Sequence, residues 1–291
     1  MLCLLNKITV SLMAMKTILF KLGILILATL APVYTLPDQD FQGQAVYFSK
    51  TKMELGNWGA RLSEAQKKEV QARLKNRLEK TYILNFNRAE SVFYEEDKLD
   101  AMSGATDSWG KNFTPGRRYK DIRENKLVQS QEFYGKRFLI KDSLLTLKWK
   151  MGSESKQIGQ YTCFKATAVV PEPELTWYDF SWGDLRSTDA AGGEGSESAG
   201  PDIELVQIEA WYCPQIPVAH GPGEYWGLPG LILEVSAGNT TILCSKIIMN
   251  PDEELKIEAP DKGKEISKMD YRATVQEKMR EMRDNRGRRR S

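Results

Sequence analysis

The sequence predicts an α+β domain, mainly antiparallel β, built as a strongly curved sheet or half-barrel with one or two helices against it. Short strand-like segments follow one another at intervals of about ten residues from residue 126 onward, a spacing typical of an antiparallel meander. Only two stretches show a helical pattern, and one of them is a basic helix at the C-terminus. Many short strands with few helices favour a single curved sheet.

The first two elements have clear local signals. Residues 41–50 alternate apolar and polar side chains, which predicts a first strand. Ser63 followed by Gln66 forms a capping box, and apolar residues then recur at every fourth position from Val70. This pattern predicts an amphipathic helix over about 64–80.

The remaining strands are expected where β-branched and aromatic residues alternate with polar ones. They are residues 82–86, 91–94, 127–133, 136–140, 144–150, 160–170, 205–213, 231–235 and 240–248. On one of them, Leu145, Leu147 and Trp149 share a face. Polar, glycine-containing stretches predict loops at 98–118 and 187–200.

The composition is that of an ordinary globular protein. The chain has 291 residues, of which 41% are apolar and 27% are charged, enough for one sizeable domain or two small ones. The net charge of +2 provides no global basic field of the kind that favours nucleic acid. Nucleic acid is therefore not an expected partner.

The N-terminal segment has the features of a secretory signal. Met15 is a better start than Met1, because Lys16 and Lys21 form a charged region beside an apolar run at 22–30. That run is short for a membrane-spanning helix, and an uncleaved N-terminal anchor is the alternative. Export to the periplasm or cell envelope is expected. The expected domains are residues 1–35 as signal peptide, 36–260 as a β-rich domain and 261–291 as a basic helical tail.

The most informative segment is residues 221–235. Its centre reads Gly227-Leu228-Pro229-Gly230-Leu231-Ile232. Glycines supply backbone freedom and prolines remove it, so the segment predicts a rigid, irregular turn that leads into a strand. Gly230 is expected to hold a positive φ and to be less replaceable than Glu224. A turn-rich apolar segment of this kind favours a structural role.

Several spaced blocks surround this motif. They are a Trp-Lys strand at 147–150, a Gly-x-Tyr-x-Cys-x-Lys-Ala segment at 159–166, Trp211-Tyr212, Ile216-Pro217, Gly221-Pro222 and the hexapeptide itself. In their order and spacing, over about residues 145–250, the chain resembles the GLPGLI family of Gram-negative envelope proteins. The resemblance implies a secreted or periplasmic β-rich protein. No activity is assigned to that family, so the resemblance carries no catalytic residue to this chain.

The sequence contains no recognisable catalytic set, which favours a non-enzymatic binding or accessory protein without a cofactor. A hydrophobic ligand and an outer-membrane transporter are the expected kinds of partner. The alternative is an envelope hydrolase, or a metal or redox protein, that uses His220 or an unpaired cysteine. His220 is the only histidine, and no G-x-S-x-G segment supplies a nucleophile for it. We expect His220 on the protein surface, in the loop that contains the hexapeptide, as a weak candidate for a metal ligand.

Three cysteines follow the signal, and export permits a disulfide. Cys163 lies early in one expected strand and Cys213 late in the next, so these ends meet if the strands pair antiparallel. We expect a Cys163–Cys213 disulfide, with Cys163–Cys244 as the alternative and one thiol left over in either case. Three buried free thiols are the remaining interpretation.

Aromatic residues are dense over 145–230, where packing in the core of a curved sheet is the default interpretation. The second interpretation is a concave site for a lipid or peptide. Its candidate ligand-binding residues are Trp149, Trp211, Tyr225 and Trp226.

The C-terminal stretch is strongly basic. Residues 262–291 hold 11 Lys or Arg and 5 Asp or Glu, a net charge of +6 against −4 for the rest of the chain. A solvated helix over 266–290 is one interpretation. The other is contact with anionic lipid head groups at a membrane surface, worth about 1 kcal/mol per basic residue.

Overall fold

The computed structural model describes residues 41–52, 61–96, 115–180 and 204–288. The chain divides into two compact units, residues 1–39 and 40–291, and every described residue lies in the second. The expected signal peptide and the expected loop at 187–200 lie outside the described residues. In the described part, no helix has both the length and the apolar character needed to cross a membrane.

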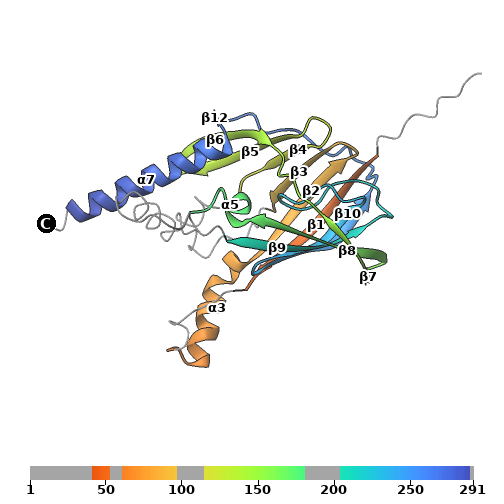
Figure 1. Ribbon diagram of the computed structural model, residues 1–291, viewed down its shortest axis with the longest axis horizontal. Helices are drawn as coiled ribbons and strands as arrows, with labels where there is room; N and C mark the ends of the chain where they lie inside the picture. Colours follow the sequence, from red (N-terminus) through yellow and green to blue (C-terminus); the bar gives the residue numbers. More distant parts are fainter. Residues whose placement is uncertain (1–40, 53–60, 97–114, 181–203, 289–291) are drawn as a thin grey trace, which may run out of the picture. The chain divides into compact units, whose positions relative to one another are not determined.

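One twelve-stranded sheet forms the framework of this unit (Figure 1). The strands are β1 Gln42–Thr51, β2 Glu79–Asn87, β3 Glu90–Glu95, β4 Arg118–Asp121, β5 Lys126–Phe133, β6 Lys136–Ser143, β7 Lys150–Ile158, β8 Tyr161–Pro171, β9 Leu205–Cys213, β10 Leu231–Ala237, β11 Thr240–Met249 and β12 Lys264–Ile266. Their order is β12-β6-β5-β4-β3-β2-β1-β11-β10-β9-β8-β7. All neighbouring pairs are antiparallel except β12 with β6, which are parallel.

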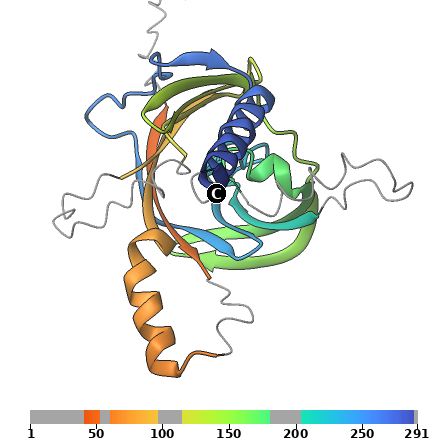
Figure 2. The ribbon, with the colours of Figure 1, turned by 90° about the vertical axis from the view of Figure 1, so that its left-hand side faces the viewer.

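The sheet curls strongly without closing, with β12 at one edge and β7 at the other (Figure 2). The helices are α3 Glu64–Leu78, α5 Glu172–Leu175 and α7 Lys268–Arg288. Seen end-on, α7 lies across the opening of the curled sheet, whereas α3 points away from it. The prediction of a mainly antiparallel, strongly curved α+β fold is confirmed, with the short α5 as a helix that the sequence did not indicate.

Helix α3 begins as its capping box predicts. The Ser63 hydroxyl accepts from the Gln66 amide at 3.3 Å, and the Gln66 side chain accepts from the Ser63 amide at 2.9 Å. Both bonds satisfy amide groups that have no partner inside the helix. The helix ends at Leu78, where strand β2 follows directly.

The expected strand at 144–150 is wrong: residues 144–149 form an irregular segment, and β7 begins at Lys150. The cause is a side-chain contact, because the indole N–H of Trp226 donates to the Leu145 carbonyl at 2.7 Å, in place of a strand partner. Strand β7 itself has almost entirely exposed side chains, so no hydrophobic alternation marked it in the sequence.

The largest apolar cluster among the described residues, which we call the main cluster, contains Tyr47 of β1, Phe86 of β2 and Leu231 of β10. The connection between β9 and β10, residues 214–230, contributes Ile216 and Val218 to it. A buried hydrogen bond from the Tyr47 hydroxyl to the Ile232 carbonyl at 2.7 Å ties β1 to the start of β10. The connection is therefore part of the core.

Helix α7 docks on the sheet along one side. Tyr271, Val275 and Met279 recur every four residues and are buried in a cluster with Phe138 of β6 and Trp177. The C-terminal helix was expected over 266–290, and the interpretation of it as solvated all round is wrong for these turns.

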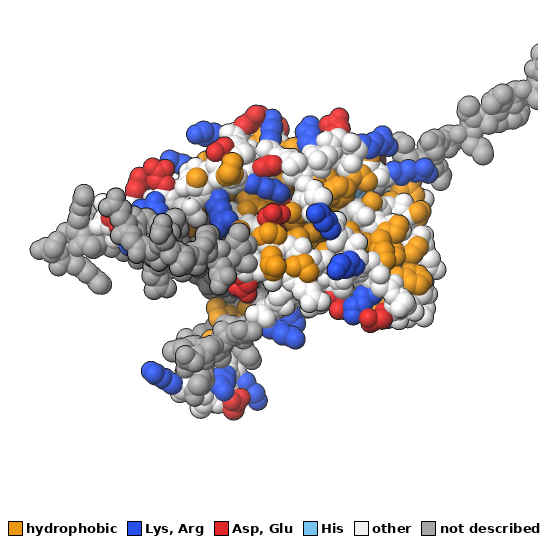
Figure 3. Space-filling view, in the orientation of Figure 1, with side chains coloured by type: hydrophobic (Ala, Val, Ile, Leu, Met, Phe, Trp, Pro, Cys, Tyr) orange, Lys and Arg blue, Asp and Glu red, His pale blue; other side chains and the backbone are white. Residues whose placement is uncertain are grey.

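The surface mixes charges and apolar groups. On the face drawn in Figure 3, charged side chains of both signs are interspersed, and hydrophobic side chains are exposed between them. Among the described residues, the most exposed large apolar side chains are Met269 at 79%, Leu205 at 64%, Val169 at 57% and Met151 at 54%. Met269 stands at the start of α7.

The expected Cys163–Cys213 disulfide is not formed, and Cys163, Cys213 and Cys244 are all buried free thiols. The strand ends do meet, because Phe164 pairs with Tyr212 in the antiparallel β8–β9 register. Each thiol instead lies near an acceptor close in sequence and packs in the main cluster as a small apolar group. Burial raises the pKa of Cys163 and of Cys244 to about 12, which keeps both protonated and unreactive.

Gly230 has a different constraint from the one expected. Its φ is not positive; instead a Cβ at this position would lie 2.2 Å from the Cys213 carbonyl oxygen. We predict that Gly230→Ala lowers the free energy of unfolding by at least about 2 kcal/mol, because two backbone segments must separate. Urea unfolding measures this.

Gly238→Ala is the matched control. Gly238 has φ +54° with open space around its Cβ position, so only conformational strain of about 1 kcal/mol is expected. Equal losses for the two variants would show that close backbone approach does not constrain Gly230.

Candidate functional site

The connection 214–230, which we call the motif loop, is held by its own backbone. The Gly227 amide donates to the Ala219 carbonyl at 2.9 Å, and the Ile232 amide donates to the His220 carbonyl at 3.0 Å. Gly227 has φ +90°, a conformation that favours glycine, so the hexapeptide does contain one residue in the expected left-handed region. A structural role for the motif stays a prediction.

Lys120 of β4 anchors the loop. Its Nζ donates to three loop carbonyls, those of Gly221 at 2.8 Å, Gly223 at 3.1 Å and Tyr225 at 3.1 Å. The side chain is 0% exposed. Burial, and then the charge of Arg118, lower the pKa of Lys120 from 10.5 to about 7.

A buried ion pair lies beside this anchor. Arg118 Nη2 is 3.1 Å from Glu224 Oε1, and both side chains are about 95% buried. Arg118 Nε also donates to Gln129 at 2.6 Å, and the Trp177 indole donates to Glu224 at 2.8 Å. Burial acts to raise the pKa of Glu224, but the charges of Arg118 and Lys268 outweigh it, so the pKa is lowered and the carboxylate stays ionised.

The same carboxylate reaches helix α7. Lys268 Nζ lies 3.8 Å from Glu224 Oε2 and 5.6 Å from the centre of the Trp177 ring. The Lys268 amide donates to Asp142 Oδ2 at 3.0 Å, which satisfies one amide at the helix start. The motif loop, the sheet and α7 are therefore joined through Glu224, Trp177 and Lys268.

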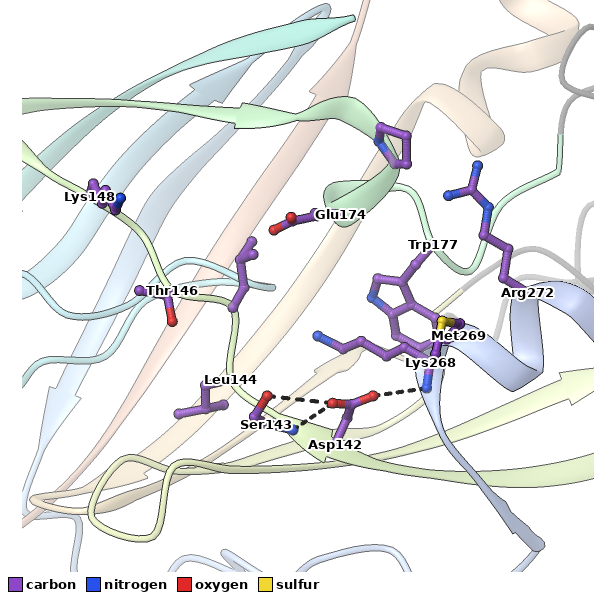
Figure 4. Close-up of a pocket in the computed structure, with 12 residues that line it drawn as sticks. Asp142, Ser143, Leu144, Thr146, Lys148, Glu174, Trp177, Lys268, Met269 and Arg272 are labelled. Carbon is purple, nitrogen blue, oxygen red and sulfur yellow. Dashed lines mark hydrogen bonds between the residues drawn. The ribbon is translucent and has the colours of Figure 1, made fainter. Parts of the chain in front are cut away.

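A cavity of about 560 Å³ opens directly beside these residues (Figure 4). It lies between the irregular segment after β6, the α5 region and the first turns of α7. Trp177 and Lys268 belong to both the cavity wall and the buried network. The lining residues are Asp142, Ser143, Leu144, Leu145, Thr146, Lys148, Pro173, Glu174, Trp177, Lys268, Met269 and Arg272.

The cavity has an apolar floor and a charged rim. Leu144, Leu145 and Trp177 are 8% exposed or less and form the floor. Lys148 and Arg272 form no ion pair within the described part of the chain. A volume of this size, with apolar walls and a few polar groups, is typical of sites for small molecules.

His220 is not on the surface, as expected from sequence, but 0% exposed. It packs near the Phe86 ring, and neither ring nitrogen has a well-aligned hydrogen-bond partner in the described part of the chain. Burial, and then the charge of Lys120, lower the pKa of His220 to about 3, while the backbone of Asn87 acts in the opposite direction. The imidazole is therefore neutral, and no acid orients it as a catalytic base.

The four candidate aromatic residues lie outside the cavity wall. Trp149 and Trp226 join the motif loop to the segment after β6, since the Trp149 indole donates to the Trp226 carbonyl at 2.8 Å. Trp211 packs in the main cluster, with Lys156 Nζ 4.2 Å from its ring centre. Tyr225 packs against a second cluster that contains Leu228. Their direct use in ligand binding stays a prediction.

Sequence reasoning missed Arg118, Lys120 and Glu224. Arg118 falls at the end of an expected loop, and Lys120 was assigned to no element, yet both lie on β4. Charged residues on one face of a strand normally indicate solvent, so only the long-range pairing with the motif loop reveals their burial. Within the described residues, no three His, Cys, Asp or Glu side chains come together as a set of metal ligands.

Together these features define a class: an open, mainly antiparallel curled-sheet protein with a buried polar anchor and a side cavity. Residues 149–234, less than a third of the chain, match the model of a family described as "Protein of unknown function (Porph_ging)". The matched region contains the hexapeptide, β7, β8, β9 and the first four residues of β10. A comparison with curated proteins finds no match.

Two solved structures are similar in part. They are titled "Structure of PNGF-II in C2 space group" and "Structure of PNGF-II in P21 space group", with TM-scores of 0.45 and 0.44 and 13% identity. The alignments cover 81% and 80% of this chain but 32% of each PNGF-II chain. This chain therefore spans about a third of the structures it matches.

The buried, neutral His220 should make the free energy of unfolding depend on pH. The unfolded chain takes up a proton near pH 6.5, whereas the folded chain does so near pH 3, so the unfolded state binds more protons between these values. We predict that the wild-type free energy of unfolding falls by about 2 kcal/mol more than that of His220→Phe between pH 7 and 4.5. Urea titrations at the two pH values measure this, and equal pH dependence would contradict a buried neutral histidine.

Proposed function

We propose that this chain is an exported periplasmic protein of the GLPGLI family that binds a small ligand in the cavity without transforming it. The signal-like residues 15–31 support export. The hexapeptide at 227–232 and the blocks around it support the family, and they overlap the region that the family model matches.

The cavity is the observation that carries the binding role. It has a volume of about 560 Å³, a floor of buried apolar side chains, and cationic groups at its rim. Its walls come from three separated parts of the chain, residues 142–148, 173–177 and 268–272, and the last of these belongs to the docked helix α7. Such a preformed site can bind a ligand without a large ordering cost.

The buried state of the reactive side chains supports a binding protein over an enzyme. His220 is enclosed and neutral, and the cysteine thiols are buried and protonated. None of these groups lines the cavity, so none can reach a ligand bound there. A hydrolase or redox enzyme that uses them would require the core to open.

The test is native mass spectrometry of the protein purified from its own envelope. We predict an added small-molecule mass on the wild type that disappears in Ser143→Trp, because an indole at this exposed wall position fills the cavity. Ser155→Trp, on exposed β7 away from the cavity, is the control and should keep the added mass. Bare wild-type protein, protein bound only to another envelope chain, or an unchanged mass in Ser143→Trp would contradict the proposal.

A further inference from the structure

The charges around the cavity are unbalanced. The lining contains three cations, Lys148, Lys268 and Arg272, and two carboxylates, Asp142 and Glu174. Asp142 is already engaged, because it accepts from the Lys268 amide at 3.0 Å and from the Ser143 amide at 2.8 Å. These donors are neutral amides, so Asp142 keeps its charge, and the lining carries three positive and two negative charges.

The network behind the cavity floor has the same sign. Besides Lys268, the single carboxylate of Glu224 has Arg118 beside it, and Lys120, with a pKa of about 7, adds part of a further positive charge. Glu224 also accepts from the Trp177 indole, so its two oxygens are already engaged. A low-dielectric wall of apolar side chains transmits this excess of positive charge into the cavity with little screening.

From these two observations we propose the ligand class, an inference that rests on the proposed function: a single-chain amphiphile with one anionic head group. Its apolar chain lies on Leu144, Leu145 and Trp177, and its head group binds between Lys268 and Arg272. Figure 4 shows Lys268 extending into the space that Trp177 borders, with Arg272 one turn further along the same helix. Glu174 disfavours a second negative charge, so a monoanion fits better than a dianion.

The probes are four twelve-carbon amphiphiles that differ only in the head group: dodecanoate, dodecyl phosphate, dodecanol and dodecylammonium. Calorimetry on the purified full-length chain should give dodecanoate at least about tenfold tighter binding than dodecanol, as a charge-assisted hydrogen bond contributes this much. Dodecylammonium should bind most weakly. Dodecanoate should also bind more tightly than dodecyl phosphate, which is largely a dianion above pH 7. The reverse order would contradict the preference for a single negative charge.

Arg272→Gln removes the positive charge while it keeps a polar, flexible side chain. We predict that this variant binds dodecanoate about tenfold more weakly and leaves dodecanol binding unchanged. Arg283→Gln is the matched control on the same helix, outside the cavity, and should bind both probes as the wild type does.

Two further results would overturn the inference, and they separate it from the proposed function. Equal affinity for dodecanoate and dodecanol, with both abolished in Ser143→Trp, would leave a binding cavity without a preference for anions. Binding of none of the four probes, while the natural added mass persists, would show that the ligand is of another class.

Discussion

The structure depends most on the hydrogen bonds that the buried side-chain nitrogen of Lys120 donates to the motif loop. The motif loop runs through the interior of the curled sheet, and an irregular buried segment presents carbonyls that no neighbouring strand can satisfy. Three of these carbonyls, those of Gly221, Gly223 and Tyr225, converge on one buried Nζ. The pKa of Lys120 is about 7, so the amine is only partly protonated at neutral pH. Each hydrogen bond contributes about 1 kcal/mol when the donor is neutral and about 1.5–3 kcal/mol when it is charged, which offsets part of the cost of burying the lysine.

The position of the loop then determines the rest of the site. Glu224 follows Gly223 and is thereby placed against Arg118, Trp177 and Lys268. Those contacts hold the start of α7, and α7 supplies one wall of the cavity. A chain of contacts therefore runs from a lysine on β4 to the wall of the cavity. The positive charge of these groups is the basis of the anion preference that we propose for the cavity.

The sequence predicted the parts of the fold that depend on local patterns. Alternating strands, the Ser63 capping box, the C-terminal helix and the turn-rich motif each depend on neighbours within a few residues, and each is present in the structure. Strand β7 escaped prediction because its side chains are exposed on both faces. Residues 144–149 alternate like a strand, but a long-range contact from Trp226 takes the place of a strand partner.

The candidate site was harder to predict for the same reason. Whether a charged or polar side chain is buried depends on what pairs with it, and the partners of Lys120 are about a hundred residues away. His220 was expected on the surface because loops usually are, yet this loop lies inside the sheet. Gly230 was expected to have a positive φ. Its constraint is instead the close approach of the Cys213 backbone, which leaves no room for a Cβ atom.

Hydrogen exchange of Lys120→Met tests the anchor most directly, with exposed Lys126→Met as the control. Methionine keeps the length and removes the donor, so we predict that the amides of Gly227 and Ile232, bonded to Ala219 and His220, lose at least about tenfold in protection. Amides of the β5–β6 pair should keep theirs. Unchanged protection of the motif loop in Lys120→Met would contradict the claim that one buried lysine holds the site together.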